Sequence, residues 1–554
     1  MSRHRHRRAA PRKKVREQVA LRALIAGGLV AALGVGVGLW ASDGDDGAPT
    51  ASAAGQASPA ASGGERSVAA APSPSPRPTR TYPLSTAPRT IPAVQRFTAA
   101  RGPGWRPAAG HRVVVTDPRL ADEGRLIAGE LGMSYAGQRS DSRSGDLRLT
   151  LGGSGGAQSY TLTVRDGRAS VGGPSDVGVF YGTRTLKQEV RGGGTAPEGV
   201  VRDAPAKPQR AFSLDIARKY FSPGWIEDRI RELGDLKYNQ FALHFSDDQA
   251  FRIESDTHPE IVAAQHLTKA QVKRIVGLAA SRHITVVPEI DSPGHLGAVL
   301  AAHPELQLRN VNGVAVRGAI DISKDASAKL LDDLLGEYAG LFPGTQWHLG
   351  GDEYQALTVS NPAASFPQLA AAARQRYGSG AGVADLATGW LNDRADTVRA
   401  HGRTMRVWND GFFRDTTVKP ASDLVVAYWT GKEIGARVPA AYLSTGRKVL
   451  NYNDEYLYYV LGEPQTFVYP TGRRIYEQWT PRVLRGTTPV SSAYDAQILG
   501  GSFSVWCDLA NSQTQDQVAA GIRMPLRATA QKLWDARTPA LSWAQFRTLA
   551  GRLG

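Results

Sequence analysis

Eight short apolar runs recur between about residues 209 and 545, and helix-like stretches separate them. Each run is rich in β-branched and aromatic residues and short enough to be a buried strand. Strands that alternate with helices pair in parallel, and eight such units predict a closed (β/α)8 barrel, the α/β architecture called the TIM barrel. The runs are residues 212–218, 240–246, 285–291, 346–352, 403–410, 424–429, 449–454 and 502–508.

A smaller folded region precedes the expected barrel. Residues 111–117, 147–153, 160–166 and 169–173 have the pattern of strands. Two stretches with helical periodicity, 121–133 and 178–190, cover them. We therefore predict a small α+β domain at 92–205 and a catalytic (β/α)8 barrel at 206–554.

The net charge of +15 would suggest nucleic-acid binding if the basic residues were spread over the folded domains, but most of the excess lies near the start of the chain. Residues 1–22 carry +8 of it, which leaves only +7 for the remaining 532 residues. A nucleic-acid footprint needs a basic patch on the folded domain, and no such run is present there. We therefore expect no nucleic-acid partner.

Residues 23–41 follow this basic tail and contain no charged side chain. A helix of that length rises about 28 Å, close to the bilayer core of about 30 Å. The positive tail 1–22 would stay cytoplasmic and the rest of the chain would face outward. A transmembrane anchor is the first expectation, and a cleavable signal peptide, which would give a secreted protein, is the alternative.

Residues 42–91 consist largely of Ala, Ser, Gly, Pro and Thr. Such a segment has too little apolar surface to offset the entropy lost on ordering, so we predict a disordered linker. The single cysteine, Cys507, excludes an intramolecular disulfide framework. The 11 histidines show no His-Glu-x-x-His or similar spacing, so neither a metal nor a cofactor is expected.

Polar and aromatic residues gather at the ends of the eight apolar runs. Because the active site of a (β/α)8 barrel lies at the carboxyl ends of its strands, these residues should share one pocket. Carboxylates and Arg bind hydroxyl groups and indole faces stack on sugar rings, so the pocket suits a sugar. The residues include Asp215, Arg218, Asp247, Asp248, Asp291, Asp352, Glu353, Trp408, Asp410, Trp429, Asp454, Trp506 and Asp508.

The sharpest motif is His-Leu-Gly-Gly-Asp-Glu at 348–353, after the fourth run. It resembles the signature of family 20 glycoside hydrolases, the β-N-acetylhexosaminidases. Three further segments, 214–221, 243–254 and 288–295, are similar to the first three barrel strands of that family. The region ending at 178–188 looks like the family's small N-terminal domain.

This resemblance implies a retaining, substrate-assisted glycosidase that acts on terminal β-linked N-acetylhexosamine in oligosaccharides or glycans. The 2-acetamido oxygen of the substrate attacks C1 and forms an oxazolinium intermediate. Glu353 would be the general acid and base, and Asp352 would orient the acetamide. We also expect the negative charge of Asp352 to raise the pKa of Glu353.

The resemblance assigns supporting roles residue by residue. Arg218 matches the arginine that binds ring hydroxyls, and His295 with either Asp247 or Asp248 matches a relay that contacts the acid. Asp291 is expected to support the site without touching the sugar. The walls of the acetamide pocket match Trp408, Trp429 and Trp506, and Tyr456 matches a tyrosine that hydrogen-bonds the acetamide oxygen.

Two departures from the family pattern leave the substrate open. The family commonly has Tyr-Leu-Asp or Tyr-Leu-Asn where this chain has Tyr456-Leu457-Tyr458, and a Glu where this chain has Asp508. The same pattern resembles the lacto-N-biosidase branch, which releases a disaccharide. A surface carbohydrate-binding protein that has lost catalysis is the alternative of a different class.

Overall fold

The computed structural model describes residues 81–411, 416–434 and 436–554. The basic tail 1–22, the expected membrane helix 23–41 and the linker up to residue 80 lie outside these residues. Within the described part of the chain, no helix combines the length and apolarity needed to cross a bilayer.

The last residues of the expected linker are packed against the folded domain. Ile91 is buried, its N–H donates to Gln188 Oε1 at 2.7 Å, and its carbonyl accepts from Gln188 Nε2 at 2.7 Å. Leu84 forms a bridge with Arg101. The predicted linker boundary at residue 91 is therefore a few residues too late, because a single buried Ile in a Pro-rich stretch leaves no periodic signal.

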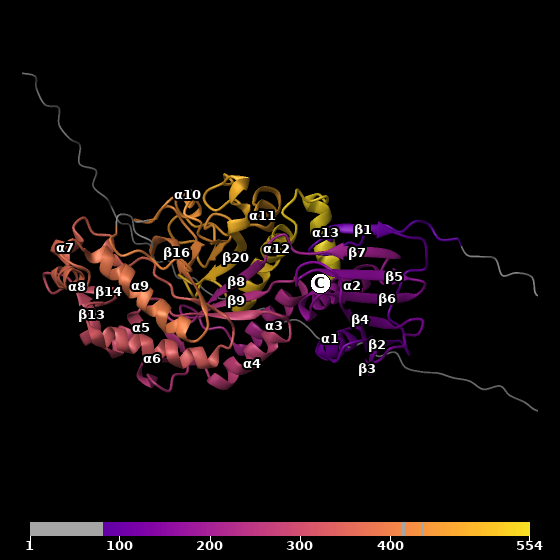
Figure 1. The fold of residues 1–554 in the computed structure, drawn as a ribbon, viewed down its shortest axis with the longest axis horizontal. Helices are drawn as coiled ribbons and strands as arrows, with labels where there is room; N and C mark the ends of the chain where they lie inside the picture. Colours follow the sequence, from indigo (N-terminus) through magenta and orange to yellow (C-terminus); the bar gives the residue numbers. More distant parts are fainter. Residues whose placement is uncertain (1–80, 412–415, 435) are drawn as a thin grey trace, which may run out of the picture. The chain divides into compact units, whose positions relative to one another are not determined.

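The small domain is a seven-stranded mixed sheet in the order β1-β7-β5-β6-β4-β2-β3. Helices α1 and α2 pack on it, and α2 begins where the Ser175 hydroxyl accepts from the Gly178 N–H and ends at Gly194 in the left-handed region. Figure 1 shows β5, β6 and β7 side by side. The elements are β1 (Arg96–Ala99), β2 (Arg112–Val115), η1 (Pro118–Leu120), α1 (Ala121–Leu131), β3 (Ser134–Gln138), β4 (Leu147–Leu151), β5 (Tyr160–Arg165), β6 (Arg168–Gly173), α2 (Asp176–Gly193) and β7 (Gly199–Asp203).

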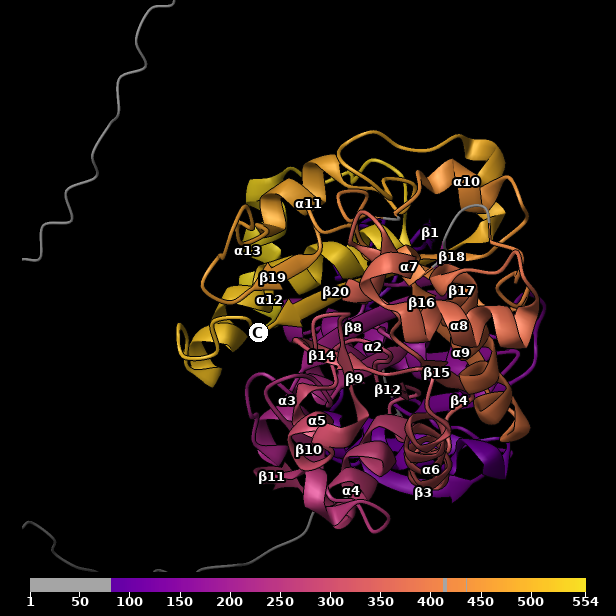
Figure 2. The same ribbon diagram turned by 90° about the vertical axis from the view of Figure 1, so that its left-hand side faces the viewer.

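The predicted barrel is confirmed. Eight parallel strands close through the pairing of β18 with β20, and β19 (Tyr458–Val460) adds an outer strand beside β20. Figure 2 shows the strands with helices around them. The eight are β8 (Gln209–Asp215), β9 (Gln240–His244), β12 (Thr285–Glu289), β15 (Gln346–His348), β16 (Thr404–Trp408), β17 (Val425–Tyr428), β18 (Val449–Asn451) and β20 (Ile498–Trp506).

Connections between the strands carry the helices and several short added elements. Helices α4 and α12 each begin with a reciprocal cap, Thr268 with Gln271 and Thr514 with Gln517. The helices are α3 (Pro223–Asp235), α4 (Lys269–Ala280), α5 (Gly297–Ala302), α6 (Asp325–Leu341), α7 (Pro362–Ser365), α8 (Pro367–Tyr377), α9 (Val383–Ala400), α10 (Pro439–Leu443), α11 (Gly472–Gln478), α12 (Gln515–Trp534) and α13 (Trp543–Leu553). The short elements are β10 (Phe251–Ile253), β11 (Val262–Leu267), β13 (Gln307–Arg309), β14 (Ala315–Ile320), η2 (Pro259–Ile261), η3 (Pro304–Leu306), η4 (Gln355–Leu357), η5 (Asn409–Gly411) and η6 (Ser492–Gln497).

The interior of the barrel below the site is partly polar. The Ser213 and Ser502 hydroxyls lie 2.9 Å apart, and Arg406 donates to Gln240 Oε1 at 2.9 Å. All four side chains are buried. Because buried polar groups are costly unless they are paired, this network favours one arrangement of the strands.

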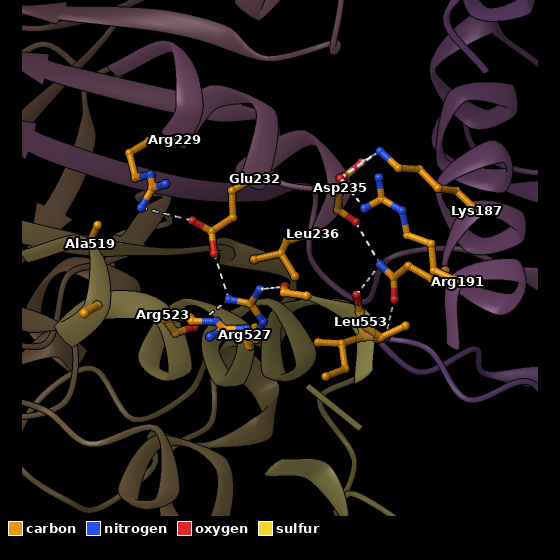
Figure 3. Close-up of a pocket in the computed structure, with 14 residues that line it drawn as sticks. Lys187, Arg191, Arg229, Glu232, Asp235, Leu236, Ala519, Arg523, Arg527 and Leu553 are labelled. Atoms are coloured by element: carbon orange, nitrogen blue, oxygen red, sulfur yellow. Dashed lines mark hydrogen bonds and ion pairs between the residues drawn. The ribbon is translucent and has the colours of Figure 1, made fainter. Parts of the chain in front are cut away.

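Salt bridges join the small domain to the barrel around a cavity of about 420 Å³. Lys187 and Arg184 of α2 lie 2.7 and 3.1 Å from Asp235 of α3. Figure 3 shows the Lys187–Asp235 pair beside a second pair within the barrel domain, between Arg527 of α12 and Glu232 of α3, at 2.7 Å. Trp534, at the end of α12, belongs to the core of the small domain. Salt bridges and the packing of Trp534 therefore hold the two domains together, in addition to the chain that connects them.

Candidate active site

The Asp352-Glu353 pair follows β15 through a double glycine. Gly350 and Gly351 have φ of +67° and +100°, a region that side chains rarely adopt. A Cβ at Gly350 would lie 1.8 Å from Asp291 Oδ1. The two glycines therefore let the strand turn sharply, so that both carboxylates reach the carboxyl end of the barrel.

Glu353 itself has φ of +50°, which is uncommon outside glycine. Its N–H donates to Asp410 Oδ2 at 2.8 Å, and Asp410 Oδ1 accepts from Trp429 Nε1 at 3.0 Å. The Glu353 side chain is 46% exposed, whereas that of Asp352 is 15% exposed. Asp410 thus holds the turn that aims Glu353 into open space beside the less exposed Asp352.

His295 lies between the pair and a buried aspartate. Its Nε2 lies 3.3 Å from Glu353 Oε2 and 3.6 Å from Asp352 Oδ2, and its Nδ1 lies 3.3 Å from Asp247 Oδ1. Burial alone would lower the pKa of His295, but the charges of Asp247 and Asp352 raise it well above its usual value. His295 is therefore held as an imidazolium.

The structure separates the two aspartates that the sequence left as alternatives. Asp247 contacts His295, whereas Asp248 Oδ1 accepts from the Gly297 N–H at 2.9 Å and Asp248 Oδ2 lies 3.2 Å from Arg317. Asp248 thus fixes the loop that carries His295 and lines the outer part of the site.

The expected rise in the pKa of Glu353 is not what the structure has. A side-chain hydrogen bond from His295 is the largest influence, and it lowers the pKa of Glu353 despite the burial that opposes it. The imidazolium of His295 therefore outweighs the neighbouring carboxylates in its effect on the pKa of Glu353.

Asp352 and Asp291 form a coupled pair of carboxyl groups. Burial, and next the charge of Asp291, raise the pKa of Asp352 well above its usual value, and burial raises the pKa of Asp291. Asp291 Oδ1 also accepts from the Gly351 N–H at 2.7 Å. Asp352 Oδ1 is buried without a hydrogen-bond partner among the described residues. The pair therefore leaves one acceptor free at the floor of the site.

Arg218 is fixed by two carboxylates. Its guanidinium lies 3.0 Å from Asp215 Oδ2 and 2.7 Å from Asp247 Oδ2. Asp215 Oδ2 also accepts from the Cys507 N–H at 3.0 Å, which joins the first and last barrel strands. Asp508 lies at the mouth of the site and lines its cavities together with Arg218.

An aromatic cavity of about 180 Å³ opens between these groups. Trp408 Nε1 donates to Glu289 Oε1 at 2.9 Å, and the ring of Trp429 stacks on that of Tyr458 at 6.0 Å between centroids. The ring centroids of Trp506 and Trp408 lie 5.9 Å apart. The cavity is lined by Arg218, His295, Asp352, Glu353, Trp408, Trp429, Glu433, Tyr458, Val460, Gln465, Phe467, Trp506 and Asp508.

Tyr456 does not line this cavity, contrary to the sequence-based expectation. It is buried in the barrel core, with the guanidinium of Arg474 over its ring at 4.4 Å. Tyr458, two residues further on, lines the cavity. The reason is the parallel pairing of β19 with β20, in which Tyr458 lies opposite Ser504 and faces the site.

A second cavity of about 490 Å³ adjoins the first and shares Arg218, His295, Glu353, Glu433 and Asp508 with it. Its other lining is mostly polar. It includes Asp247, Asp248, Gln249, Arg317, Gln355, Thr358 and Asp410. The loop that carries Glu353 thus lines both the small aromatic cavity and the larger polar one.

Sequence reasoning assigned no role to several residues of the site. Asp410 stands at the end of an apolar run and Glu289 lies inside one, so both carried a signal of position only. Tyr458 begins the short outer strand β19, and Glu433, Gln465 and Phe467 lie outside the helices and strands, where local pattern says little. Asp291, His295 and Asp352 offer ligand atoms within 4.8 Å of one another, a geometry that also suits a metal ion.

A buried charge network under the cavity predicts how stability depends on pH. His244 lies 2.8 Å from Asp247 and 3.3 Å from Glu289. Burial disfavours the charged forms of both His244 and Glu289. Even so, Glu289 and Asp247 raise the pKa of His244 to about 10. His348 and His244 lower the pKa of Glu289 to about 2.

The stabilising charge of His244 is fully present below its unfolded pKa of 6.5 and is lost as the pH rises toward 10. That of Glu289 is present above 4.5 and is lost as the pH falls toward 2. We expect Tm, followed by circular dichroism, to be highest between these limits. His244→Gln should flatten the alkaline decline, and an unchanged alkaline slope in that variant would contradict the account.

Two family models match the chain. "Glycosyl hydrolase family 20, domain 2" matches residues 87–204, and "Glycosyl hydrolase family 20, catalytic domain" matches residues 208–537. These ranges correspond to the small domain and to the barrel with its surrounding helices.

Curated relatives and solved structures agree with these matches. A lacto-N-biosidase from Bifidobacterium bifidum is 29% identical over 478 residues, which cover 85% of this chain and 42% of that protein. A β-hexosaminidase from Porphyromonas gingivalis is 34% identical over 226 residues, which cover 35% of this chain and 29% of that protein. The chain thus spans less than half of the length of these two relatives.

A mutant Streptomyces plicatus β-hexosaminidase in complex with the product GlcNAc superposes with a TM-score of 0.66 at 25% identity. The match covers 86% of this chain and 95% of that one. A β-N-acetylhexosaminidase from Streptomyces coelicolor gives a TM-score of 0.66 at 26% identity, over 85% and 96% of the two chains. Together with the double-glycine turn and its Asp-Glu pair, these matches assign the chain to glycosyl hydrolase family 20.

Proposed function

We propose that the chain is a retaining β-N-acetylhexosaminidase that removes a terminal β-linked N-acetylhexosamine by substrate-assisted catalysis. The observation that carries the proposal is the arrangement of Asp352 and Glu353 around His295, on the wall of an aromatic cavity. The cavity of about 180 Å³ is smaller than the sites of drug-sized ligands, which measure about 300–1,000 Å³, and suits one sugar ring.

In the first step the acetamide carbonyl oxygen of the substrate attacks C1, and the bond between C1 and the leaving oxygen breaks. Glu353 gives its proton to that oxygen, and an oxazolinium forms. In the second step water attacks C1, its proton passes to Glu353, and the acetamide reforms with retention at C1. The free Oδ1 of Asp352 accepts the acetamide N–H. The positive charge that develops on that nitrogen favours the ionised form of Asp352, and the carboxylate in turn stabilises this charge.

The indoles hold the acetamide in attacking geometry and exclude water from the intermediate. Arg218, already oriented by Asp215 and Asp247, presents its guanidinium to the ring hydroxyls. Glu353 must be protonated when substrate is bound. When substrate binds, water leaves the open side of the Glu353 carboxyl group. This loss of solvation raises the pKa of Glu353 and so favours the protonated form that can act as the acid.

A second candidate, release of a disaccharide, is favoured by the larger cavity beside Arg218. That cavity offers room beyond the hydroxyls of the first sugar, and the relative from Bifidobacterium bifidum is a lacto-N-biosidase. Asp508 stands between the two cavities, where it can bind a hydroxyl of either ring.

Hydrolysis of p-nitrophenyl β-glycosides of GlcNAc, GalNAc and lacto-N-biose by the full chain tests both candidates. Faster release from the monosaccharides supports the first, and release from lacto-N-bioside alone supports the second. Saturable binding of these sugars without any hydrolysis would instead favour a carbohydrate-binding protein that has lost catalysis.

Substitution of Tyr458 and of Tyr456 tests which of the two tyrosines faces the cavity. The Tyr458 ring stacks on Trp429, and burial raises the pKa of its hydroxyl well above 10, so it remains a donor for the acetamide oxygen. We expect Tyr458→Phe to lower kcat/KM for p-nitrophenyl GlcNAc about 10-fold, the value of one hydrogen bond. Tyr456→Phe should change it less than twofold, and equal losses in the two variants would contradict this placement.

The cellular setting remains a proposal, supported by the basic tail 1–22 and the uncharged residues 23–41. We infer that this segment anchors the chain in the cell membrane with the catalytic domain outside the cytoplasm. The full chain should then sediment with membranes and be degraded by protease added to intact cells. Recovery of the intact chain from the cytoplasmic fraction would oppose the proposal.

A further inference from the structure

Two histidines and a glutamate meet on the outside of the barrel, where η2 packs against α5, away from both catalytic cavities. His258 Nδ1 lies 2.9 Å from Glu260 Oε1, and His303 Nε2 lies 2.8 Å from the same oxygen. The three ligand atoms lie within 4.8 Å of one another. Figure 2 shows the region near α5.

We propose that His258, Glu260 and His303 form a binding site for a divalent transition-metal ion, with Zn²⁺ as the best match. Two imidazoles and one carboxylate are ligand types that Zn²⁺ prefers, at about 2.0–2.2 Å. A tetrahedral ion with such bonds sets neighbouring ligand atoms about 3.3 Å apart. The spacings of 2.8 and 2.9 Å need only a small opening, and water completes the coordination.

The ring nitrogens that face away from the site have carboxylates of their own. His258 Nε2 lies 3.7 Å from Asp333 Oδ2, and His303 Nδ1 lies 3.4 Å from Glu305 Oε1. Metal-bound histidines almost always give their second N–H to such an acceptor, which fixes the tautomer and the ring orientation. Neither contact is a hydrogen bond in the structure, and His258 Nε2 is buried without a hydrogen-bond partner among the described residues. The main support for the site is therefore the meeting of two imidazole nitrogens and a carboxylate oxygen.

The backbone that carries His258 is also held in place. Glu337 of α6 accepts from the Ser255 hydroxyl and the Asp256 N–H, each at 2.7 Å, and the Ser255 hydroxyl accepts from the His258 N–H at 3.0 Å. At the other side, the His303 N–H ends α5 by donating to the Val299 carbonyl at 3.0 Å. Ligands on fixed backbone lose little entropy when the ion binds.

A bound ion would join two connections of the barrel. Helix α5 begins at Gly297, two residues after His295, and the Gly297 N–H is bonded to Asp248. Clamping the far end of α5 to η2 therefore supports the loop that brings His295 to Glu353. Sequence spacing gave no hint of this site, because His303 lies on a different connection from His258 and Glu260.

The test is calorimetric titration of ZnCl₂ into the full chain after removal of metals with a chelator, together with thermal unfolding. We expect saturable binding that raises Tm, and binding to this site at least 100-fold weaker in His303→Ala. Glu260→Gln, which keeps the size of the side chain, should lower the affinity for Zn²⁺ at least 10-fold. Circular dichroism establishes that each variant is folded.

Controls separate this site from other histidines. Among the described residues, His266 belongs to no such cluster of ligand atoms, and its Nδ1 lies 2.8 Å from the Ala263 carbonyl oxygen, so His266→Gln is the matched variant and should titrate like the wild type. The chain also carries His4 and His6 near its start, and binding there would persist in His303→Ala. Zn²⁺ binding and Tm that are the same in wild type, His303→Ala and Glu260→Gln would overturn the proposal, as would a chain without saturable binding.

Discussion

Replacement of Glu353 by Gln is expected to lower kcat about 10²–10⁴-fold on glycosides with a sugar as leaving group. The amide has the shape of the carboxylic acid but cannot give a proton to the leaving oxygen. It also cannot accept one from water in the second step. Steady-state hydrolysis of an oligosaccharide of β-linked GlcNAc measures the loss, because a sugar alkoxide leaves only when it is protonated.

Leaving-group dependence separates this role from a general loss of structure. A dinitrophenyl glycoside needs little protonation, so Glu353→Gln should keep much more of the first step on that substrate. Azide, which attacks without a base, should restore the second step. Glu477→Gln, a partly exposed carboxylate on α11 paired with Arg473, is the matched control and should keep full activity. Wild-type turnover of the oligosaccharide by Glu353→Gln would show that another group is the acid.

Replacement of Asp352 by Asn is the second large effect that we expect, a loss of about 10²–10³ in kcat, the value typical of one group that stabilises transition-state charge. The Asp352 Oδ1 that is free in the structure is the acceptor for the acetamide N–H. An asparagine amide offers less negative charge to the oxazolinium and can turn its NH₂ group toward the acetamide.

The affinity for a thiazoline analogue of the oxazolinium isolates this effect. We expect the analogue to bind Asp352→Asn more weakly by about the same factor as the loss in kcat/KM, since both report the charge on the bicyclic intermediate. Asp228→Asn, an exposed carboxylate on α3 paired with Arg231, should bind the analogue as the wild type does. A large loss of kcat with unchanged affinity for the analogue would assign Asp352 a different role.

The barrel could be predicted because each of its strands has a recognisable local sequence pattern. A short run rich in Val, Ile, Leu and aromatic residues forms a buried strand whatever lies beside it, and eight such runs in one series specify the closed sheet. The same logic placed Arg218, Asp247 and Asp352 in one pocket, since each stands at the carboxyl end of a strand, whereas His295 was assigned by the family resemblance. The strands β1, β3 and β7 of the small domain were missed, because each mixes small, polar or charged residues into four or five positions and so lacks the clear apolar pattern of β2 and β4.

The finer features of the site depend on contacts between distant segments. Which of Tyr456 and Tyr458 faces the cavity is set by the register of β19 on β20, and a shift of two residues leaves the local pattern unchanged. The lowered pKa of Glu353 is set by His295 on another loop. Such pairings, like the meeting of His258 with His303, exist only once the chain is folded.

The most direct test of the central proposal is proton NMR of the anomeric configuration of the first sugar released from p-nitrophenyl N-acetyl-β-glucosaminide by the full chain. Substrate assistance inverts C1 twice, so the account predicts that β-GlcNAc accumulates first and then mutarotates to the α-anomer. Initial accumulation of α-GlcNAc would show a single inversion by water and would contradict it.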